Sequence, residues 1–184
     1  MISLQRHLAL VGMMGCGKST VGNILAREIE VRCLDLDSLI VEERQSSISD
    51  IFAREGEDRF RHYEEVMLRR VLAIRSPVIL ALGGGTLLAE QNQELVRSSA
   101  DSFWLQASPA TLLRRLRGDQ SRPVLGSQYC REDLELALAL REPGYRAVAP
   151  TLQVTDGLSC ETVVERILTV LRERSCGSRG DGSI

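Results

Sequence analysis

The chain has 184 residues, of which 43% are hydrophobic, 26% are charged and 4% are aromatic, and its formal net charge is −2. This length predicts one domain with a substantial, mainly aliphatic core. The balanced charge argues against a general nucleic-acid binder, which needs a basic excess. The sequence contains neither a membrane-spanning apolar run nor a signal-peptide pattern. We therefore expect a cytoplasmic protein that acts without nucleic acid or membrane. A monomer is expected as well, although the sequence has no signal for oligomeric state.

The five cysteines are an odd number without a C-x-x-C pair, which is typical of reduced intracellular thiols rather than of a disulfide framework. They are Cys16, Cys33, Cys130, Cys160 and Cys176. Cys16 lies inside the glycine-rich loop described below. It is either a small side chain that the loop tolerates or a redox-sensitive thiol, because helix N-termini lower thiol pKa values.

The first predicted element is a buried strand over residues 7–11, a short and mostly apolar run. A glycine-rich segment over residues 12–19 follows it at once. A helix is predicted next, from the helical spacing of Val21, Ile24, Leu25 and Ile29. A phosphate held by the glycine-rich segment would therefore lie at a helix N-terminus.

Residues 12–19 match G-x-x-x-x-G-K-[ST], the phosphate-binding loop of many nucleotide-using folds. Gly15 and Gly17 allow the backbone to curl so that its N–H groups point at phosphate oxygens. Lys18 would contact the β- and γ-phosphates, and the Ser19 hydroxyl would bind Mg²⁺. The alternative is an ordinary glycine turn between a strand and a helix, but such a turn has no need of Lys18 and Ser19 together.

A second strand is predicted over residues 31–35, and it ends in Asp35-Leu36-Asp37. Ligands of open α/β sheets bind outside the carboxyl ends of the strands. Because residues two apart in a strand point the same way, both carboxylates are expected to face the phosphate loop. One can serve Mg²⁺ through water, and the other can accept a proton from a substrate hydroxyl. The alternative is a solvated pair that caps the next helix.

Three helices are predicted in the following segment. A short one passes through residues 39–41, a second begins near Asp50 with Ser49 as its cap and runs to Gly56, and a longer one covers about residues 57–74. Arg61 lies near the start of the long helix, with Glu64 and Glu65 three and four residues later. Either glutamate can touch Arg61 on the helix surface, and Glu64 would orient Arg61 if Arg61 faces the crevice.

The strongest buried-strand signal covers residues 78–82, and Gly83-Gly84-Gly85 follows it. Three glycines are costly to order, so they predict a backbone surface that a ligand approaches closely, with a plain flexible turn as the alternative. A phosphate-loop protein often has an aspartate at the end of such a strand to support Mg²⁺. Because this strand ends without one, Asp35 is the best substitute.

The remaining predicted elements are a strand at 102–105, helices at about 109–117 and 131–142, a strand at 151–154 and a final helix around 163–171. Repeated β–α alternation predicts an α/β fold with a mostly parallel sheet and helices on both faces. We expect a single domain over residues 1–174. Residues 175–184 are rich in glycine and serine and predict a disordered tail.

Residues 118–126 break the chain between two predicted helices, with glycine at both ends and Arg122 in the middle. This segment is either an ordinary surface loop or a lid that brings Arg122 over the phosphates. Phosphoryl transfer favours such a closure because water is a competing nucleophile.

Arg141 lies near the end of a predicted helix. An arginine can bind a carboxylate through two parallel hydrogen bonds. Arg61 and Arg141 beside Asp37 would therefore suit a substrate with both a carboxylate and hydroxyl groups. The alternative for each arginine is an ordinary surface residue.

A set of motifs occurs in one order along the chain: Gly15-Cys16-Gly17-Lys18-Ser19-Thr20, Asp35-x-Asp37, Ile51-Phe52 with Gly56-Glu57, Phe60-Arg61-x-x-Glu64, Gly83-Gly84-Gly85, Arg122-Pro123-x-Leu125 and Arg141-x-x-x-Tyr145. A phosphate loop alone is shared by many families, but the ordered set is much more specific. Over roughly residues 6–170 the chain resembles the shikimate kinase family. The resemblance implies ATP-dependent phosphorylation of the 3-hydroxyl of shikimate, in the route to aromatic amino acids.

The family fold implied is that of the small nucleoside monophosphate kinases: three layers, with a five-stranded parallel sheet flanked by helices. The resemblance places substrate-binding helices at about 36–62 and a lid at about 118–131. It implies ATP binding by Gly15, Cys16, Gly17, Lys18, Ser19, Thr20, Arg115 and Arg122. It implies shikimate binding by Asp37, Arg61, Gly83, Gly84, Gly85 and Arg141.

The same resemblance implies three catalytic residues, Lys18, Asp37 and Arg122. Ser19 would bind Mg²⁺ directly, and Asp35 would support the metal through water. Arg115 is expected against adenine, and Arg61 and Arg141 are expected on the substrate carboxylate.

Two alternatives stay open. A related small-molecule kinase such as a gluconate kinase shares the loop but need not share the arginine pair. A nucleotide-binding regulator without transferase activity would have no need of Asp37, Arg61 and Arg141. A nucleic-acid-binding ATPase is disfavoured by charge and size.

Overall fold

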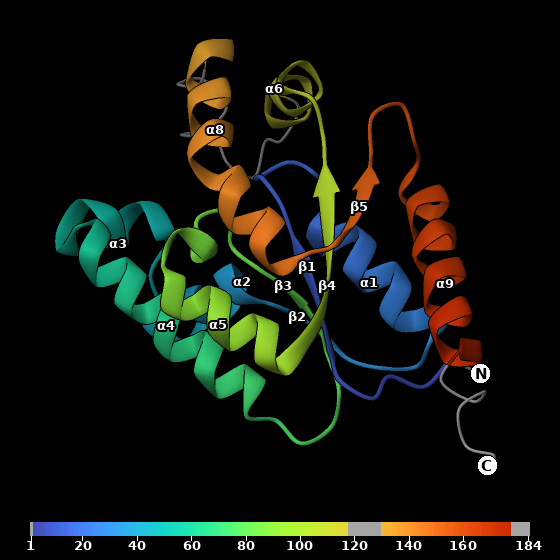
Figure 1. Cartoon of the computed structure of the whole chain (residues 1–184). Coiled ribbons are helices and arrows are strands. Elements are labelled where there is room, and N and C mark those ends of the chain that lie inside the picture. Colours follow the sequence, from blue (N-terminus) through green and yellow to red (C-terminus); the bar gives the residue numbers. More distant parts are fainter. Residues whose placement is uncertain (1, 118–129, 178–184) are drawn as a thin grey trace.

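A five-stranded, wholly parallel sheet forms the centre of the molecule, with strands in the order β2-β3-β1-β4-β5 (Figure 1). This computed structural model of the chain describes residues 2–117 and 130–177. The strands are β1 (His7–Val11), β2 (Cys33–Asp35), β3 (Ile79–Ala81), β4 (Ala100–Gln106) and β5 (Thr151–Val154). The predicted α/β class and five-stranded parallel sheet are confirmed.

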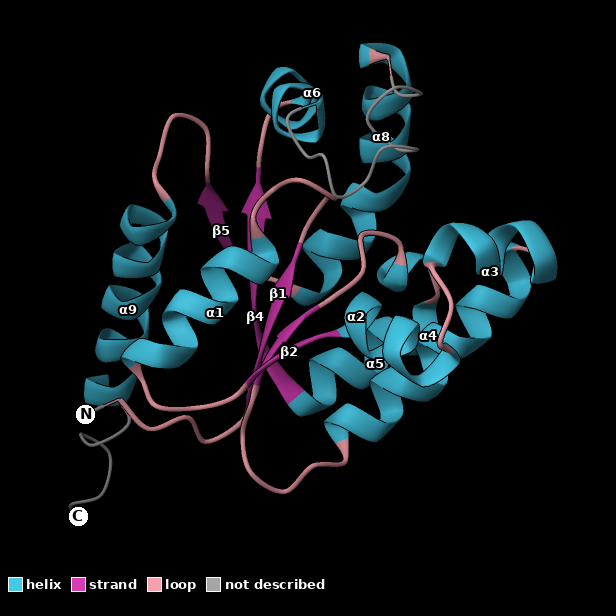
Figure 2. Ribbon diagram, turned by 180° about the vertical axis from the view of Figure 1, so that it is seen from behind, coloured by secondary structure: helices cyan, strands magenta, loops and turns pink. Residues whose placement is uncertain are grey.

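Helices cover both faces of the sheet, which gives three layers. They are α1 (Lys18–Glu28), α2 (Leu36–Arg44), α3 (Ile48–Glu55), α4 (Glu57–Leu72), α5 (Glu90–Ser99), α6 (Pro109–Arg117), α8 (Arg131–Val148) and α9 (Cys160–Gly177), with a 3₁₀ turn η1 (Thr86–Leu88). Figure 2 shows α1 and α9 side by side on one face, with α4 and α5 on the other side of the sheet. None of these described helices is long and apolar enough to cross a membrane.

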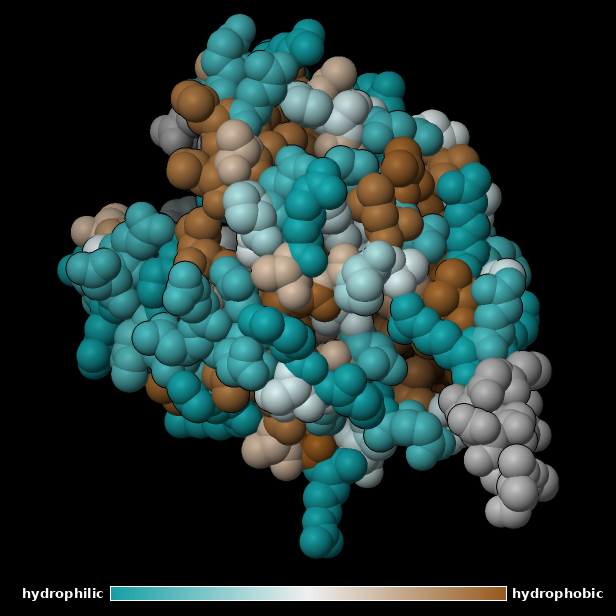
Figure 3. Space-filling model, viewed as in Figure 1, coloured by the Kyte–Doolittle hydropathy of each residue, from teal (hydrophilic) through white to brown (hydrophobic). Residues whose placement is uncertain are grey.

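The central strand β1 is buried on both faces, as a continuous apolar run in a parallel sheet requires. Leu8 and Leu10 point into the core beneath α1 and α9, while Ala9 and Val11 point into the core beneath α4 and α5. The outer surface over α4 and α5 is mainly hydrophilic (Figure 3). These helices therefore bury one apolar stripe and leave a charged face in solvent.

Two predicted helix boundaries are wrong. Ser49 does not cap α3; the cap is Ser47, whose hydroxyl accepts a hydrogen bond from the Asp50 N–H at 3.1 Å. The helix predicted to end at 142 continues through Pro143 to Val148. Proline removes one hydrogen bond from a helix interior, but here the last turns of α8 are buried against η1 and β4, and this packing outweighs the loss.

The remaining differences concern segments with weak local signals. Asp37 lies in the first turn of α2 and not in a strand-like stretch, because α2 begins directly after Asp35. Helix α5 and the turn η1 were not among the predicted elements. Helix α9 extends to Gly177, so residues 175–177 of the expected tail are helical. The expected lid with Arg122 and the rest of the tail lie outside the described residues.

Candidate active site

The glycine-rich loop joins the end of β1 to the start of α1, so its backbone curls over the helix N-terminus. Gly12 must be glycine because a Cβ there would lie 2.3 Å from the carbonyl oxygen of Leu105. Gly17, the N-cap of α1, has a φ of 104°, a conformation that side chains disfavour. The loop therefore presents N–H groups and the positive end of the α1 dipole to one point, which is an anion-binding arrangement.

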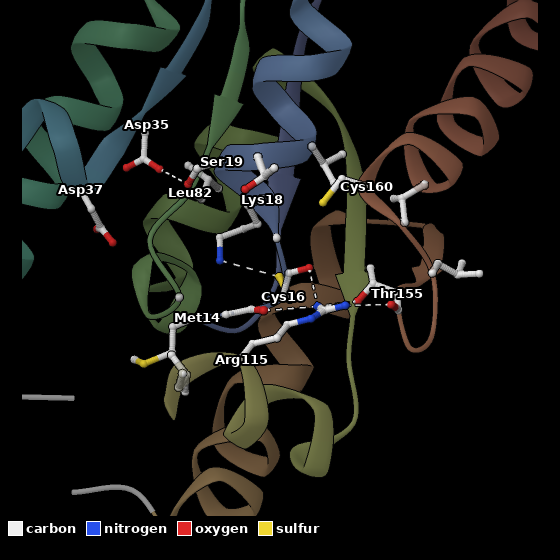
Figure 4. A pocket seen from close by; sticks show the side chains of 18 of the residues that line it. Met14, Cys16, Lys18, Ser19, Asp35, Asp37, Leu82, Arg115, Thr155 and Cys160 are labelled. Carbon is white, nitrogen blue, oxygen red and sulfur yellow. Dashed lines mark hydrogen bonds between the residues drawn. The ribbon is translucent and has the colours of Figure 1, made fainter. Parts of the chain in front are cut away.

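The Lys18 side chain is buried and folds back over this loop. Its Nζ donates hydrogen bonds to the carbonyl oxygens of Gly12, at 2.9 Å, and Met13, at 3.0 Å. Figure 4 shows the ammonium group pointing into the pocket beside Cys16. The loop thus carries one positive side-chain charge at its centre, in addition to its backbone donors.

The Ser19 hydroxyl donates a hydrogen bond to Asp35 Oδ2 (Figure 4). Asp35 Oδ1 also accepts from the Ser38 N–H at 3.0 Å and so caps α2. The capping alternative considered for Asp35 is therefore correct, and it does not exclude a second role. A hydroxyl and a carboxylate beside a phosphate loop are the hard oxygen ligands that Mg²⁺ prefers.

A cavity of about 530 Å³ opens over the loop. Residues from the loop, β2, α2, α6 and α9 line it, including Asp35 and Asp37. The expectation that both carboxylates face one crevice is thus confirmed, although Asp37 reaches it from a helix. The volume is in the usual range for a small-molecule site. The lining residues are Met14, Gly15, Cys16, Gly17, Lys18, Ser19, Thr20, Val21, Asp35, Asp37, Leu82, Gly84, Arg115, Leu116, Thr155, Leu158, Ser159, Cys160 and Val163.

Arg115 lines this cavity and connects the phosphate loop to Thr155 by hydrogen bonds (Figure 4). Its guanidinium donates to the carbonyl oxygens of Gly15 and Cys16, each at 3.3 Å, and of Thr155 at 2.9 Å. The expected site residues do not include Thr155 or the residues after it, although several of them line the cavity. The available signal was the compact segment between β5 and α9, at the carboxyl end of a parallel strand.

Gly83 and Gly85, which follow β3, lie in van der Waals reach of three charged side chains. A Cβ on Gly83 would lie 2.6 Å from Glu64 Oε1 and 2.7 Å from Asp37 Oδ1. A Cβ on Gly85 would lie 2.6 Å from Arg61 Nη1. A side chain at either position would therefore displace these charged groups.

Gly84, between them, touches both the phosphate loop and the second arginine. A Cβ on Gly84 would lie 3.2 Å from the backbone nitrogen of Met14 and 3.4 Å from Arg141 Nη1. Gly84 also lines the main cavity, whereas Arg61 and Arg141 do not. The two arginines thus stand around the glycine segment at the edge of the cavity.

Arg61 is held by two glutamates of its own helix, α4. Glu57 Oε1 accepts from Nη2 at 2.8 Å, and the buried Glu64 accepts from Nη1. Burial lowers the pKa of Arg61, but Glu64 and Glu57 outweigh this effect and raise the pKa overall. Thr86 Oγ1 donates to the other Glu64 oxygen at 2.7 Å. Glu64 therefore orients Arg61 as expected, while Glu65 pairs with Arg69 on the helix surface.

The site residues expected from the sequence thus form two adjoining groups among the described residues. The nucleotide-side residues lie on the phosphate loop, with Arg115 across the cavity. The substrate-side residues surround Gly83–Gly85. Arg122 lies outside the described residues.

The family model for shikimate kinase matches residues 14–172 of this chain. A shikimate kinase from Geobacter sulfurreducens is 43% identical over 168 residues, which are 91% of this chain and 92% of the relative. The chain belongs to the shikimate kinase family. The resemblance drawn from the ordered motifs is confirmed.

Solved structures agree with this assignment. Shikimate kinase from Acinetobacter baumannii, solved in complex with shikimate, superposes with a TM-score of 0.85 at 31% identity, covering 92% of this chain and 94% of that one. A gluconokinase from Sinorhizobium meliloti 1021 superposes with a TM-score of 0.68 at 17% identity, covering 98% of this chain and 99% of that one, which shows the shared fold alone. The chain is therefore an enzyme of the shikimate kinase family, and its family implies ATP-dependent phosphotransfer.

Proposed function

We propose that this site transfers the γ-phosphoryl group of ATP to the 3-hydroxyl of shikimate and releases ADP and shikimate 3-phosphate. One observation carries the proposal: Gly84 lies close to both the phosphate loop and Arg141, since a Cβ there would lie 3.2 Å from the Met14 backbone nitrogen and 3.4 Å from Arg141 Nη1. A nucleotide phosphate and a carboxylate-bearing acceptor can therefore meet across this glycine.

On the nucleotide side, the N–H groups of residues 15–20 would bind the phosphates, and Lys18 would leave the Gly12 and Met13 carbonyl oxygens for the β- and γ-phosphates. Arg115 would flank the adenine, because it reaches from α6 to Thr155 at the far wall of the cavity. Ser19 and Asp35 fit Mg²⁺, with Asp35 acting through water. When bound, this ion would neutralise phosphate charge.

On the acceptor side, Arg61 and Arg141 would grip the carboxylate, since guanidinium groups bind carboxylates in a planar fork. The backbone of Gly83–Gly85 would lie against the ring through Gly84, which lines the cavity and has no side chain to prevent close approach. Asp37 would bind the reacting hydroxyl, since its carboxylate lines the cavity beside Gly83.

The reaction would be an in-line displacement in which the acceptor oxygen forms a bond to the γ-phosphorus while the bond to the β–γ bridging oxygen breaks. Asp37 would accept the hydroxyl proton, and the leaving electrons would remain on ADP. Lys18 would stabilise charge on the transferring group. Arg122, on the expected lid, would add a second positive charge.

We propose that the enzyme acts as a monomer in the cytoplasm. We propose that its partners are ATP and shikimate, without nucleic acid or membrane.

A coupled assay of ADP formation tests the proposal when it is run with shikimate, with gluconate and without an acceptor. We expect ADP formation that depends on shikimate and on Mg²⁺. Turnover with gluconate instead would favour the related sugar-acid kinases. ATP binding without turnover on either acceptor would favour a regulator.

A further inference from the structure

Tyr145 of α8 holds the glycine segment through a hydrogen bond to its backbone. Its side chain is 1% exposed, and its hydroxyl donates a hydrogen bond to the carbonyl oxygen of Gly84 at 2.5 Å. The ring packs against Trp104 of β4, with centroids 5.8 Å apart. Packing of the ring against Trp104 thus holds the hydroxyl in place, and the Gly84 carbonyl accepts a hydrogen bond from a buried donor.

Gly144, the preceding residue, brings α8 close to the same segment. A Cβ on Gly144 would lie 2.4 Å from the carbonyl oxygen of Leu87 in η1, so glycine is required for this approach. Gly144 and Tyr145 together dock the second half of α8 on residues 84–87. This docking accounts for the persistence of the helix beyond Pro143.

Arg141 lies one turn before Tyr145 on α8, so the two side chains share a helix face. Arg141 Nη1 donates to the Sδ of Met13 at 3.2 Å, in the phosphate loop. One segment of α8 thus contacts the phosphate loop through Arg141 and the glycine segment through Tyr145.

We propose that Tyr145 is a positioning residue that fixes Gly84 relative to Arg141 and thereby sets the affinity for the acceptor's carboxylate. This inference rests on the proposed function, because it assigns the carboxylate to Arg141. Tyr145 touches neither the acceptor nor the nucleotide in this assignment. Its effect is confined to the positions of Gly84 and Arg141, which are assigned to the acceptor.

The chemistry of Tyr145 suits this role. Burial raises its pKa far above the ordinary value, although the nearby Arg141 and Arg61 oppose the shift. The hydroxyl therefore stays protonated and remains a donor to the Gly84 carbonyl throughout the range in which enzymes are assayed.

Tyr145→Phe tests the inference, since it removes the hydroxyl and keeps the ring that packs on Trp104. We expect the KM for shikimate to rise about fivefold, the effect of one neutral hydrogen bond, with the KM for ATP unchanged. Tyr63→Phe is the matched control: its hydroxyl donates to Glu55 at 2.6 Å on the surface of α3 and α4. This control should change neither KM.

A double-mutant cycle with Arg141→Ala separates positioning from simple stabilisation. If Tyr145 acts through Arg141, Tyr145→Phe will raise the KM for shikimate less in the Arg141→Ala background than in the wild type. Equal effects in both backgrounds, or a lower melting temperature with an unchanged KM for shikimate, would overturn the inference. A wild-type enzyme without shikimate-dependent ADP formation would instead overturn the proposed function, and this inference with it.

Discussion

Ser19 and Asp35 are joined by a hydrogen bond between the first turn of α1 and the last residue of β2. The bond brings a hydroxyl and a carboxylate from separate elements to one point beside the phosphate loop. Asp35 has a second duty there as the N-cap of α2. A test of whether Asp35 supports a metal ion must therefore distinguish loss of its negative charge from loss of the helix cap.

Asp35→Asn makes that separation, because asparagine caps helices as well as aspartate does. We expect the Mg²⁺ concentration for half-maximal activity to rise by roughly tenfold, since the charged oxygen is lost, with an unchanged melting temperature. Asp35→Ala should lose both functions and unfold with about 1 kcal/mol less free energy. An unchanged Mg²⁺ requirement in Asp35→Asn would rule out the metal role.

Asp37→Asn should bind ATP normally and lose activity. The asparagine cannot accept the hydroxyl proton, and general bases contribute about 10²–10⁴-fold to rates. Steady-state kcat and the Kd of a non-hydrolysable ATP analogue measure the two effects separately. Because phosphoryl transfer has a loose transition state, wild-type turnover in this variant would mean that Asp37 only binds the hydroxyl or does not face it.

Arg61→Ala and Arg141→Ala should each raise the KM for shikimate about ten- to hundredfold, since a hydrogen bond to a charged group contributes about 1.5–3 kcal/mol. The KM for ATP should change much less. Arg69→Ala is the control on α4, because Arg69 pairs with Glu65 on the exposed face. Equal effects on both substrates would contradict carboxylate binding by these arginines.

Glu64→Gln should destabilise the fold by about 1–3 kcal/mol, because Glu64 is buried and receives hydrogen bonds from both Arg61 and Thr86. Glu65→Gln, the next residue on α4, should change the unfolding free energy by less than about 1 kcal/mol, since exposed pairs contribute little. Chemical denaturation measures both. Similar stabilities for the two variants would show that the buried network is not held by the charge of Glu64.

Burial, and the nearby Asp35 carboxylate, raise the pKa of Cys33 to about 11. The thiolate is the reactive form, so alkylation of Cys33 in the native protein should keep accelerating up to about pH 11. In the unfolded chain the thiol has its ordinary pKa of about 8.5, and the rate should level off above it. Peptide mass spectrometry after iodoacetamide pulses follows this residue, and identical pH profiles in the two states would contradict the shift.

The sequence predicts well those parts of the fold that depend on local chemistry. The strand over residues 7–11 and the phosphate loop carry their signals within a few residues, so both were predictable. Pro143 misled the boundary of α8, because the packing of its last turns against η1 and β4 is a long-range effect. Helix α5 has a weak local signal, because its N-cap, Ala89, makes no side-chain capping bond.

The candidate site was predictable where its residues form a motif and not where they meet only in space. The orientation of Arg61 by Glu64 follows from helical spacing, and the structure has this contact. By contrast, the hydrogen bond from Thr86 to Glu64 joins residues 22 apart in the chain. The hydrogen bond from Tyr145 to the Gly84 carbonyl joins residues 61 apart. Such pairs are set by how β3, α4 and α8 pack, which no local pattern encodes.

A crystal structure with shikimate and a non-hydrolysable ATP analogue tests most directly whether nucleotide and acceptor meet across Gly84. We predict that the acceptor's carboxylate lies between the guanidinium groups of Arg61 and Arg141. Its 3-hydroxyl should face Asp37, and Lys18 should contact the terminal phosphate. Arg61 and Arg141 turned into bulk solvent, with the acceptor bound elsewhere, would contradict the assignment.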